Sequence, residues 1–276
     1  MKQPIIHSRT LAALERHQSN PSHGLILSGK HGVGKTTIAT WLATSLESEP
    51  IIIEAAPDTQ SITIEQVRNL YQITRSGSPL TLIIKNAQTM SHEAQNAFLK
   101  LLEEPPAHTH FILTANHRDS LLATIQSRTQ HIEVLPPPTD QIVATAQERS
   151  SIPVDEIQSL LRSVDMMPGR LFRLLENSEL QKSHLARINT AKQFYSGPNY
   201  QRHLTCIMAK FERSWAIDLL DTLAIIVDSL VQANKTNAAR LKKLMQQAEV
   251  IEEVAKDISA RNASVKIQLT KLIENL

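Results

Sequence analysis

Short apolar runs alternate with segments of helical periodicity along the first half of the chain. The apolar runs have the length of buried strands and span 25–27, 51–53, 82–84, 111–113 and 131–134. Between them, apolar side chains recur every three or four residues, as they do on one face of a helix. An alternation of strands and helices predicts a parallel sheet that is covered by helices on both faces.

Local signals predict where several of these helices begin and end. A helix is expected over 36–46, directly after a Gly-rich turn. Thr63 and Gln66 have the spacing of a capping box, in which the two side chains satisfy N–H groups at a helix start. Ser91 is the expected N-cap of another helix, which the prolines at 105–106 should stop.

The second half of the chain carries helical patterns and no convincing strand. Three consecutive prolines, 136–138, predict a stiff extended linker before it. The sequence Ser-Gly-Pro-Asn at 196–199 predicts a further break between helices. We therefore predict three domains, an α/β domain over 1–136, a small helical domain over 137–180 and a larger helical domain over 181–276.

Composition narrows the class of protein. The chain has 276 residues, a formal net charge of +2, 41% hydrophobic and 20% charged residues, which is ordinary for a globular protein. Its one cysteine excludes an internal disulfide and a four-cysteine zinc site, and favours a reducing compartment. The N-terminus lacks the apolar core of a signal peptide, and aspartates interrupt the most apolar stretch, 215–231. We therefore expect a cytoplasmic protein.

A phosphate-binding motif follows the first predicted strand. Residues 29–36 match GxxxxGK(S/T) in every fixed position, between a predicted strand and a predicted helix. In this motif backbone N–H groups and the helix N-terminus bind phosphate, Lys35 reaches the β/γ phosphates, and the Thr36 hydroxyl can bind Mg²⁺. The alternative is an inherited loop that no longer binds nucleotide. The expected nucleotide-binding residues are Gly29, Gly32, Val33, Gly34, Lys35, Thr36 and Thr37.

The acidic residues that ATP hydrolysis needs are missing from their expected place. The strand at 82–84 ends in Lys85 and Asn86, and no Asp or Glu occurs between Gln66 and His92. A lysine there would repel Mg²⁺ or pair with phosphate itself. We predict a site that holds ATP or ADP with little or no turnover, and its need for Mg²⁺ stays open. The alternative is that carboxylates come from another part of the chain.

Several segments resemble blocks of one known family. Residues 96–106 read NAFLKLLEEPP, close to the family pattern NALLKxLEEPP. Residues 111–114 and 121–129 resemble its FILxT and LLxTIxSRC blocks, and 61–68 resemble its IxIxxIR segment. The family is that of the AAA+ subunits of bacterial clamp loaders. The resemblance implies a parallel-sheet P-loop domain, a helical lid and a C-terminal helical collar; the second half fits by size and position only.

Within that family, two types of subunit are candidates for this chain. The gamma/tau type hydrolyses ATP and keeps the acidic pair, whereas the delta-prime type often lacks it and supplies an arginine in trans. Lys85 and Asn86 favour the delta-prime type, as does the sequence Met-Pro-Gly-Arg at 167–170, in which Gly169 takes the place of a nucleotide-sensing arginine. Many members carry a zinc module, but the segment 46–61 is too short and lacks cysteine, so we predict no zinc.

The resemblance also assigns roles to single residues. Arg128 corresponds to the arginine finger that acts on a neighbour's ATP, although Thr129 replaces the family's cysteine. Thr114 and Asn116 are the candidates for a polar sensor at the end of a strand. Two acids, 103–104, fall at a helix C-terminus, where the helix dipole disfavours them, which suggests either an interface or a solvated face.

The function that this resemblance implies is that of a delta-prime-like subunit of the DNA polymerase III clamp loader. Such a subunit would assemble with gamma/tau and delta types and help load the sliding clamp on primed DNA, with little or no ATP hydrolysis of its own. Two alternatives stay open, an active gamma/tau-like motor and an AAA+-derived binding module outside replication.

Overall fold

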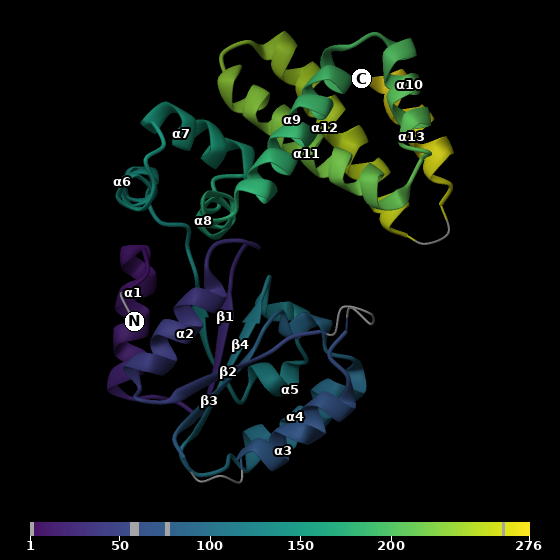
Figure 1. Ribbon diagram of the computed structural model, residues 1–276. Helices are drawn as coiled ribbons and strands as arrows, with labels where there is room; N and C mark the ends of the chain where they lie inside the picture. The colour runs from purple at the N-terminus through teal and green to yellow at the C-terminus, as the bar shows by residue number, and fades with distance from the viewer. Residues whose placement is uncertain (1–2, 56–60, 75–77, 261–262) are drawn as a thin grey trace. The chain divides into compact units, whose positions relative to one another are not determined.

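The computed structural model describes residues 3–55, 61–74, 78–260 and 263–276. The chain divides into two compact units (Figure 1). The first comprises Met1–Ser151 with Met167–Arg170, and the second comprises Ile152–Met166 with Leu171–Leu276. The predicted three-domain division at 136 and 180 stays a prediction. Within the described residues, no helix is long and apolar enough to cross a membrane.

A five-stranded parallel sheet forms the centre of the first unit, which confirms the predicted α/β domain. The strand order is β2-β3-β4-β1-β5. Because all pairs are parallel, the carboxyl ends of the strands meet at one edge of the sheet and the amino ends at the other. The strands are β1 (Gly24–Ser28), β2 (Glu49–Ile53), β3 (Leu80–Ile84), β4 (Thr109–Ala115) and β5 (Gln130–Glu133).

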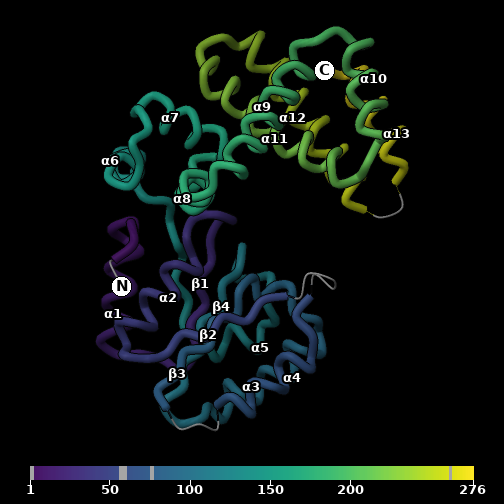
Figure 2. The backbone as a smooth tube through the Cα atoms, viewed as in Figure 1, coloured from purple at the N-terminus to yellow at the C-terminus, as the bar shows by residue number. Residues whose placement is uncertain are grey.

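Helices cover both faces of this sheet, as the apolar runs predicted. Leu25 and Leu27 of β1 pack into one core with α1 and α2, whereas Ile26 packs into the other core with α3, α4 and α5. The backbone trace shows α3 and α4 together on one face, and α1 and α2 on the opposite face (Figure 2). These helices are α1 (Ser8–Ser19), α2 (Lys35–Ser45), α3 (Ile64–Ile73), α4 (His92–Glu103) and the short α5 (Ala123–Gln126).

The predicted helix starts are confirmed at atomic detail. Thr63 Oγ1 accepts the Gln66 N–H at 3.4 Å, and Gln66 Oε1 accepts the Thr63 N–H at 3.0 Å, which completes the capping box of α3. Ser91 Oγ accepts the Ala94 N–H at 3.1 Å at the start of α4. The α4 helix ends at Glu103, just before the two prolines.

The rest of the described chain is helical, as predicted. The triproline segment leads into α6, with Pro138 at its N-cap, and α9 ends at the predicted break before α10. Apolar residues of α9 to α13 pack into one core in the second unit. The helices are α6 (Thr139–Arg149), α7 (Val154–Ser163), α8 (Pro168–Glu176), α9 (Ser178–Ser196), α10 (Asn199–Met208), α11 (Arg213–Ala233), α12 (Ala238–Ser259) and α13 (Val265–Asn275).

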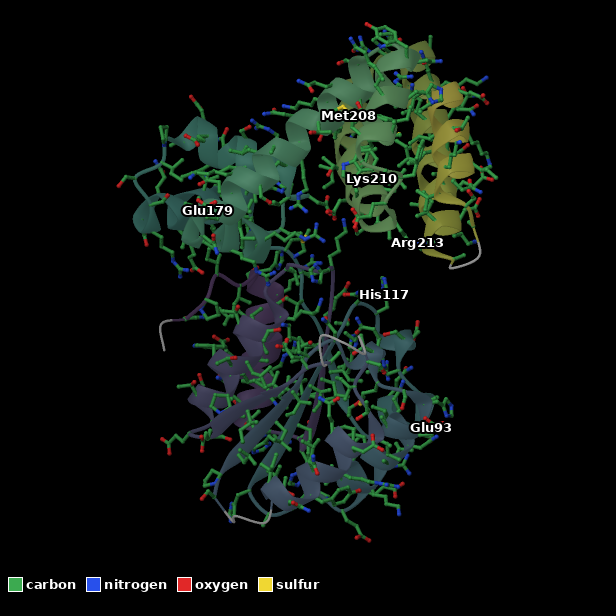
Figure 3. All side chains as sticks on the ribbon, turned by 45° about the vertical axis from the view of Figure 1, so that its right-hand side comes forward. Glu93, His117, Glu179, Met208, Lys210 and Arg213 are labelled. Carbon is green, nitrogen blue, oxygen red and sulfur yellow. The ribbon has the colours of Figure 1, made fainter. Side chains whose placement is uncertain are left out.

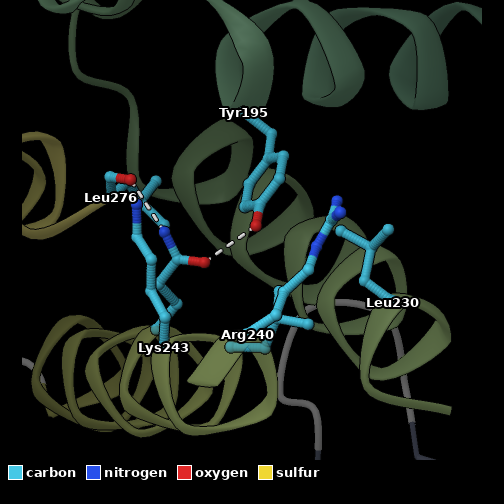
Figure 4. A pocket seen from close by; sticks show the side chains of 7 residues that line it. Tyr195, Leu230, Arg240, Lys243 and Leu276 are labelled. Carbon is cyan, nitrogen blue, oxygen red and sulfur yellow. Dashed lines mark hydrogen bonds between the residues drawn. The ribbon is translucent and has the colours of Figure 1, made fainter. Parts of the chain in front are cut away.

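A polar bridge ties three segments of this helical unit together (Figure 4). The Tyr195 hydroxyl on α9 donates to Gln247 Oε1 on α12 at 2.8 Å. Gln247 Nε2 in turn donates to the main-chain oxygen of Leu276 at 2.7 Å. Because Gln247 is buried, these two bonds satisfy its amide where water cannot.

Candidate nucleotide site

The phosphate loop has the geometry that its motif predicts. It connects the end of β1 to the start of α2, which begins at Lys35, one residue before the predicted start. Gly34 is the N-cap of α2 and has φ +105°, in the left-handed region that favours glycine. A Cβ on Gly29 would lie 2.6 Å from the main-chain oxygen of Val134, so only glycine fits there. The loop thus leaves backbone N–H groups at a helix N-terminus, as anion binding requires.

Lys35 lies inside this loop. Its ammonium donates to the main-chain oxygens of Gly29 and Lys30, the latter at 3.0 Å. The side chain is buried, and burial lowers the pKa of its ammonium to about 8. A phosphate would replace two neutral acceptors with charged oxygens and so favour the protonated amine.

The three other predicted loop residues differ in their exposure. Val33 is buried and packs into the same core as α1 and α2. Thr36 is half-buried, and within the described chain no residue hydrogen-bonds to its hydroxyl. Thr37 is exposed. The Thr36 hydroxyl is therefore the one with the partial enclosure that a ligand-binding group would have.

The candidate sensor residues lie at the same edge of the sheet as the loop. Thr114 Oγ1 accepts the N–H of Asn86 at 2.9 Å, so this hydroxyl joins the ends of β4 and β3. The main-chain oxygen of Asn116 accepts the Gly29 N–H at 3.2 Å. The side-chain Oδ1 of Asn116 is buried and has no hydrogen-bond partner in the described part of the chain. Of the two candidates, Asn116 thus has the polar group available for a ligand.

Lys85 forms an ion pair with Glu54, a partner that the sequence did not predict. Its Nζ contacts Oε2 of Glu54, and the two side chains are 35% and 59% exposed. Glu54 follows β2, and β2 pairs with β3, so the two residues follow adjacent strands. Sheet order alone brings them together, because 31 positions separate them in the sequence. Lys85 therefore has a carboxylate partner within the chain.

The segment 167–170 packs against the phosphate loop within the first unit. The N–H of Gly169 donates to the main-chain oxygen of Gly32 at 2.8 Å. Arg170 Nη2 lies 3.2 Å from Nδ1 of His31. Met167 is buried in the core that also holds Val33. Gly169 takes the place that the family resemblance gives to a nucleotide-sensing arginine, and the next residue, Arg170, places its guanidinium beside the loop.

Arg128 lies at the opposite edge of the sheet. It precedes β5, whose first residue Gln130 is in register with Leu25 near the start of β1. The loop follows the other end of β1, about 15 Å away at the rise of an extended strand. Arg128 pairs with Glu103, with 2.7 Å between Nη2 and Oε1. The structure therefore does not bring Arg128 together with the chain's own loop.

The described residues contain no group of three or more His, Cys, Asp or Glu side chains that could hold a metal ion. Residues 56–60, which fall in the segment too short for a zinc module, lie outside the described part of the chain.

Comparison with known proteins adds relatives to this geometry. A family model described as DNA polymerase III, delta subunit, matches residues 47–138. The delta' subunit of Escherichia coli is 31% identical over 117 residues, which cover 42% of this chain and 35% of the relative. The Haemophilus influenzae delta' subunit is 30% identical over 154 residues, covering 54% and 46%. The gamma subunit of Buchnera aphidicola is 32% identical over 140 residues, covering 41% and 38%. The chain spans less than half the length of each.

Solved structures share the fold. A DNA polymerase III gamma subunit-related protein from Thermotoga maritima has a TM-score of 0.65 and 19% identity, over 96% of this chain and 97% of that one. The RuvB Holliday junction branch migration motor of the same organism has a TM-score of 0.50 and 13% identity, over 69% and 76%. These matches show that the chain is similar to AAA+ subunits of bacterial clamp loaders over its phosphate-loop domain, and that it shares their fold.

Proposed function

We propose that the chain is a delta'-type clamp-loader subunit, which holds nucleotide with little or no turnover and supplies Arg128 to a neighbour. One observation carries the proposal. Arg128 precedes β5 at the amino edge of the sheet, whereas the chain's own phosphate loop lies at the carboxyl edge. A guanidinium in that position can reach only the nucleotide of another subunit.

The carboxyl edge of the sheet supports nucleotide binding. Lys35 lies within the loop, Thr36 has an unengaged hydroxyl among the described residues, and the Asn116 amide oxygen is buried without a partner there. In this proposal Lys35 pairs with the β/γ phosphates, and Asn116 is the polar sensor. When Mg²⁺ is bound with ATP, it supplies charge neutralisation at the phosphates.

The ends of β2 and β3 support weak hydrolysis. Phosphoryl transfer by this class of site needs a carboxylate at the Mg²⁺ and a group that orients the attacking water. Lys85 occupies the first position and pairs with Glu54, the carboxylate that follows the adjacent strand. Asn86 occupies the second, and its backbone N–H donates to Thr114. Neither residue supplies a free carboxylate, so turnover by the chain itself would be slow.

In a neighbour's site, Arg128 would act on charge that develops during phosphoryl transfer. Its planar guanidinium can donate two hydrogen bonds to phosphate oxygens, and arginine fingers contribute about 10³–10⁵ in rate elsewhere. The proposed partners are gamma/tau and delta subunits, with the sliding clamp and primed DNA bound through the complex in the cytoplasm. Three domains, an AAA+ domain, a lid over 137–180 and a collar over 181–276, are part of this proposal.

An exposed apolar stripe on α10 supports assembly through the helical unit. Leu204 and Ile207 are 52% and 58% exposed, and Met208, labelled in Figure 3, is 83% exposed. Tyr200, on the same helix, is also exposed. Apolar side chains gathered on one exposed helix face are typical of surfaces that contact another protein.

The test is DNA-stimulated ATP hydrolysis by a loader assembled from this chain with gamma/tau and delta subunits. Replacing Arg128 with Ala should reduce the rate at least tenfold, while the chain alone should show almost no turnover. Arg16→Ala is the matched control, because this exposed arginine on α1 hydrogen-bonds to Ala12 of its own helix and, among the described residues, to no other element. Unchanged turnover in the Arg128→Ala loader would overturn the proposed role.

The second candidate is an active gamma/tau-like motor. The intact loop and the similarity to gamma subunits favour it. Mg²⁺-dependent turnover by the chain alone would support it over the first proposal. A third candidate, a binding module outside replication, predicts that the chain is not retained by clamp-loader subunits of its own organism in a pull-down.

A further inference from the structure

Arg128 is held by three acceptors of its own chain. Nη2 pairs with Glu103 Oε1 at 2.7 Å. Nη1 donates to the main-chain oxygen of Thr124 at 3.1 Å and lies 3.3 Å from Ser127 Oγ. Both terminal nitrogens of the guanidinium therefore have acceptors, and Glu103 provides the charged one.

The backbone that carries this pair is fixed by packing. The residues next to the two charged ones, 102 and 129, pack against Gly24 at the start of β1. A Cβ on Gly24 would lie 2.8 Å from Thr129 Cγ2 and 3.1 Å from Leu102 Cδ2. The Thr129 hydroxyl also donates to the main-chain oxygen of Ile125 at 2.8 Å. Since both backbone segments are held, a change of partner at Arg128 needs only a side-chain movement.

The ion pair itself is exposed enough to be exchanged. The Arg128 and Glu103 side chains are 38% and 48% exposed. An exposed ion pair of this kind shifts the equilibrium between its paired and separated side chains by only about 1.4- to 5-fold. A phosphate group carries more charge than a carboxylate and accepts from the same guanidinium edge, so it can displace Glu103.

A phosphate and the Glu103 carboxylate cannot both use Nη2 at hydrogen-bond distance without repelling each other. We propose that Glu103 is a positioning residue that competes with the neighbour's ATP phosphate for Arg128, an inference that rests on the proposed function. It holds and neutralises Arg128 until the neighbour binds ATP. Binding of that ATP then includes the cost of opening the pair.

The experiment measures ATP hydrolysis against ATP concentration in the assembled loader with clamp and primed DNA. Glu103→Gln keeps the size of the side chain and removes its charge. The KM for ATP should fall about 1.4- to 5-fold, and the effect should appear in KM rather than in kcat. Glu104→Gln is the matched control, since Glu104 is exposed and forms no ion pair among the described residues. Its KM should match wild type.

A second arm separates competition from a merely structural effect. In an Arg128→Ala background, Glu103→Gln should leave the KM for ATP unchanged, because the guanidinium for which Glu103 and ATP compete is absent. A KM shift that persists there, an equal shift with Glu104→Gln, or a KM that rises or stays unchanged in Glu103→Gln would overturn the inference. The proposed function fails separately, if Arg128→Ala alone leaves turnover unchanged.

Discussion

The N–H of Gly169 donates a 2.8 Å hydrogen bond to the main-chain oxygen of Gly32. Residue 169 is the second residue of α8, and residue 32 lies in the middle of the phosphate loop. A contact between two backbones tolerates less adjustment than one between side chains, so the start of α8 and the loop should respond together to substitution.

Gly169→Ala should disturb both the start of α8 and the phosphate loop. The new Cβ would lie 2.8 Å from the Gly32 oxygen, a backbone atom that cannot turn aside. We expect a loss of about 1–3 kcal/mol in the free energy of unfolding and weaker nucleotide binding. Chemical denaturation and calorimetric titration with ADP measure the two effects. Glu176→Ala at the exposed end of α8 should stay within about 0.5 kcal/mol of wild type, and an equal loss there would contradict the explanation.

Nucleotide affinity should depend on pH through Lys35. Burial lowers the pKa of its ammonium to about 8, and bound phosphate favours the protonated form. Affinity for ADP should therefore be greatest below pH 8 and decrease as the pH rises through that value. Titrations from pH 6.5 to 9.5 would measure this decrease. Lys35→Gln should bind ADP weakly and show no such decrease with pH. Lys30→Gln, at an exposed loop position, should keep the decrease.

The same group affects folding in a defined pH range. The pKa of Lys35 is lower in the folded chain than its usual 10.5, so the unfolded chain binds more protons between about 8 and 10.5. The cost of burying the charge is present below pH 8 and is relieved as the pH rises. Relative to Lys35→Met, the wild-type chain should therefore gain stability across this range. Paired denaturation curves at several pH values would measure it.

Mg²⁺ should add little to nucleotide binding by the wild-type chain. Lys85 stands where a metal-binding carboxylate is expected, and it pairs with Glu54. The Kd for ATP should change less than about threefold between Mg²⁺ and EDTA, whereas Lys85→Asp should introduce a clear dependence on Mg²⁺. Lys85→Met is the control, because methionine has neither the positive charge of lysine nor the negative charge of aspartate. A strong loss of wild-type affinity in EDTA would show that another group holds the metal.

Thr114 and Asn116 should respond differently to substitution. Thr114→Val removes the acceptor for the Asn86 N–H and should destabilise the fold by about 1–3 kcal/mol. Asn116→Ala removes a buried Oδ1 that has no partner among the described residues, so it should weaken nucleotide binding with little loss of stability. Thermal denaturation with and without ADP distinguishes the two. The reverse pattern would make Thr114 the sensor.

The sequence by itself determined the features whose causes are local. Strands were predicted from apolar runs, α3 and α4 from their caps, and the phosphate loop from glycines and a lysine at fixed spacing. These signals involve neighbours along the chain, and the structure confirms them with shifts of a few residues at the ends of elements. The run 51–53 belongs to a longer strand, because pairing with β3 extends β2 back to Glu49.

Only the tertiary structure decided which side chains became partners. Glu54 meets Lys85 because β2 pairs with β3, and Glu103 meets Arg128 because the end of α4 and the turn before β5 close on Gly24. From the sequence, Lys85 was expected to repel Mg²⁺ or pair with phosphate, and Arg128 was expected to act on a neighbour's ATP. Neither residue was predicted to have a partner within its own chain. The physical reason is that local backbone preferences fix where a strand or helix forms, whereas charge pairing depends on which elements the sheet order and core packing bring together.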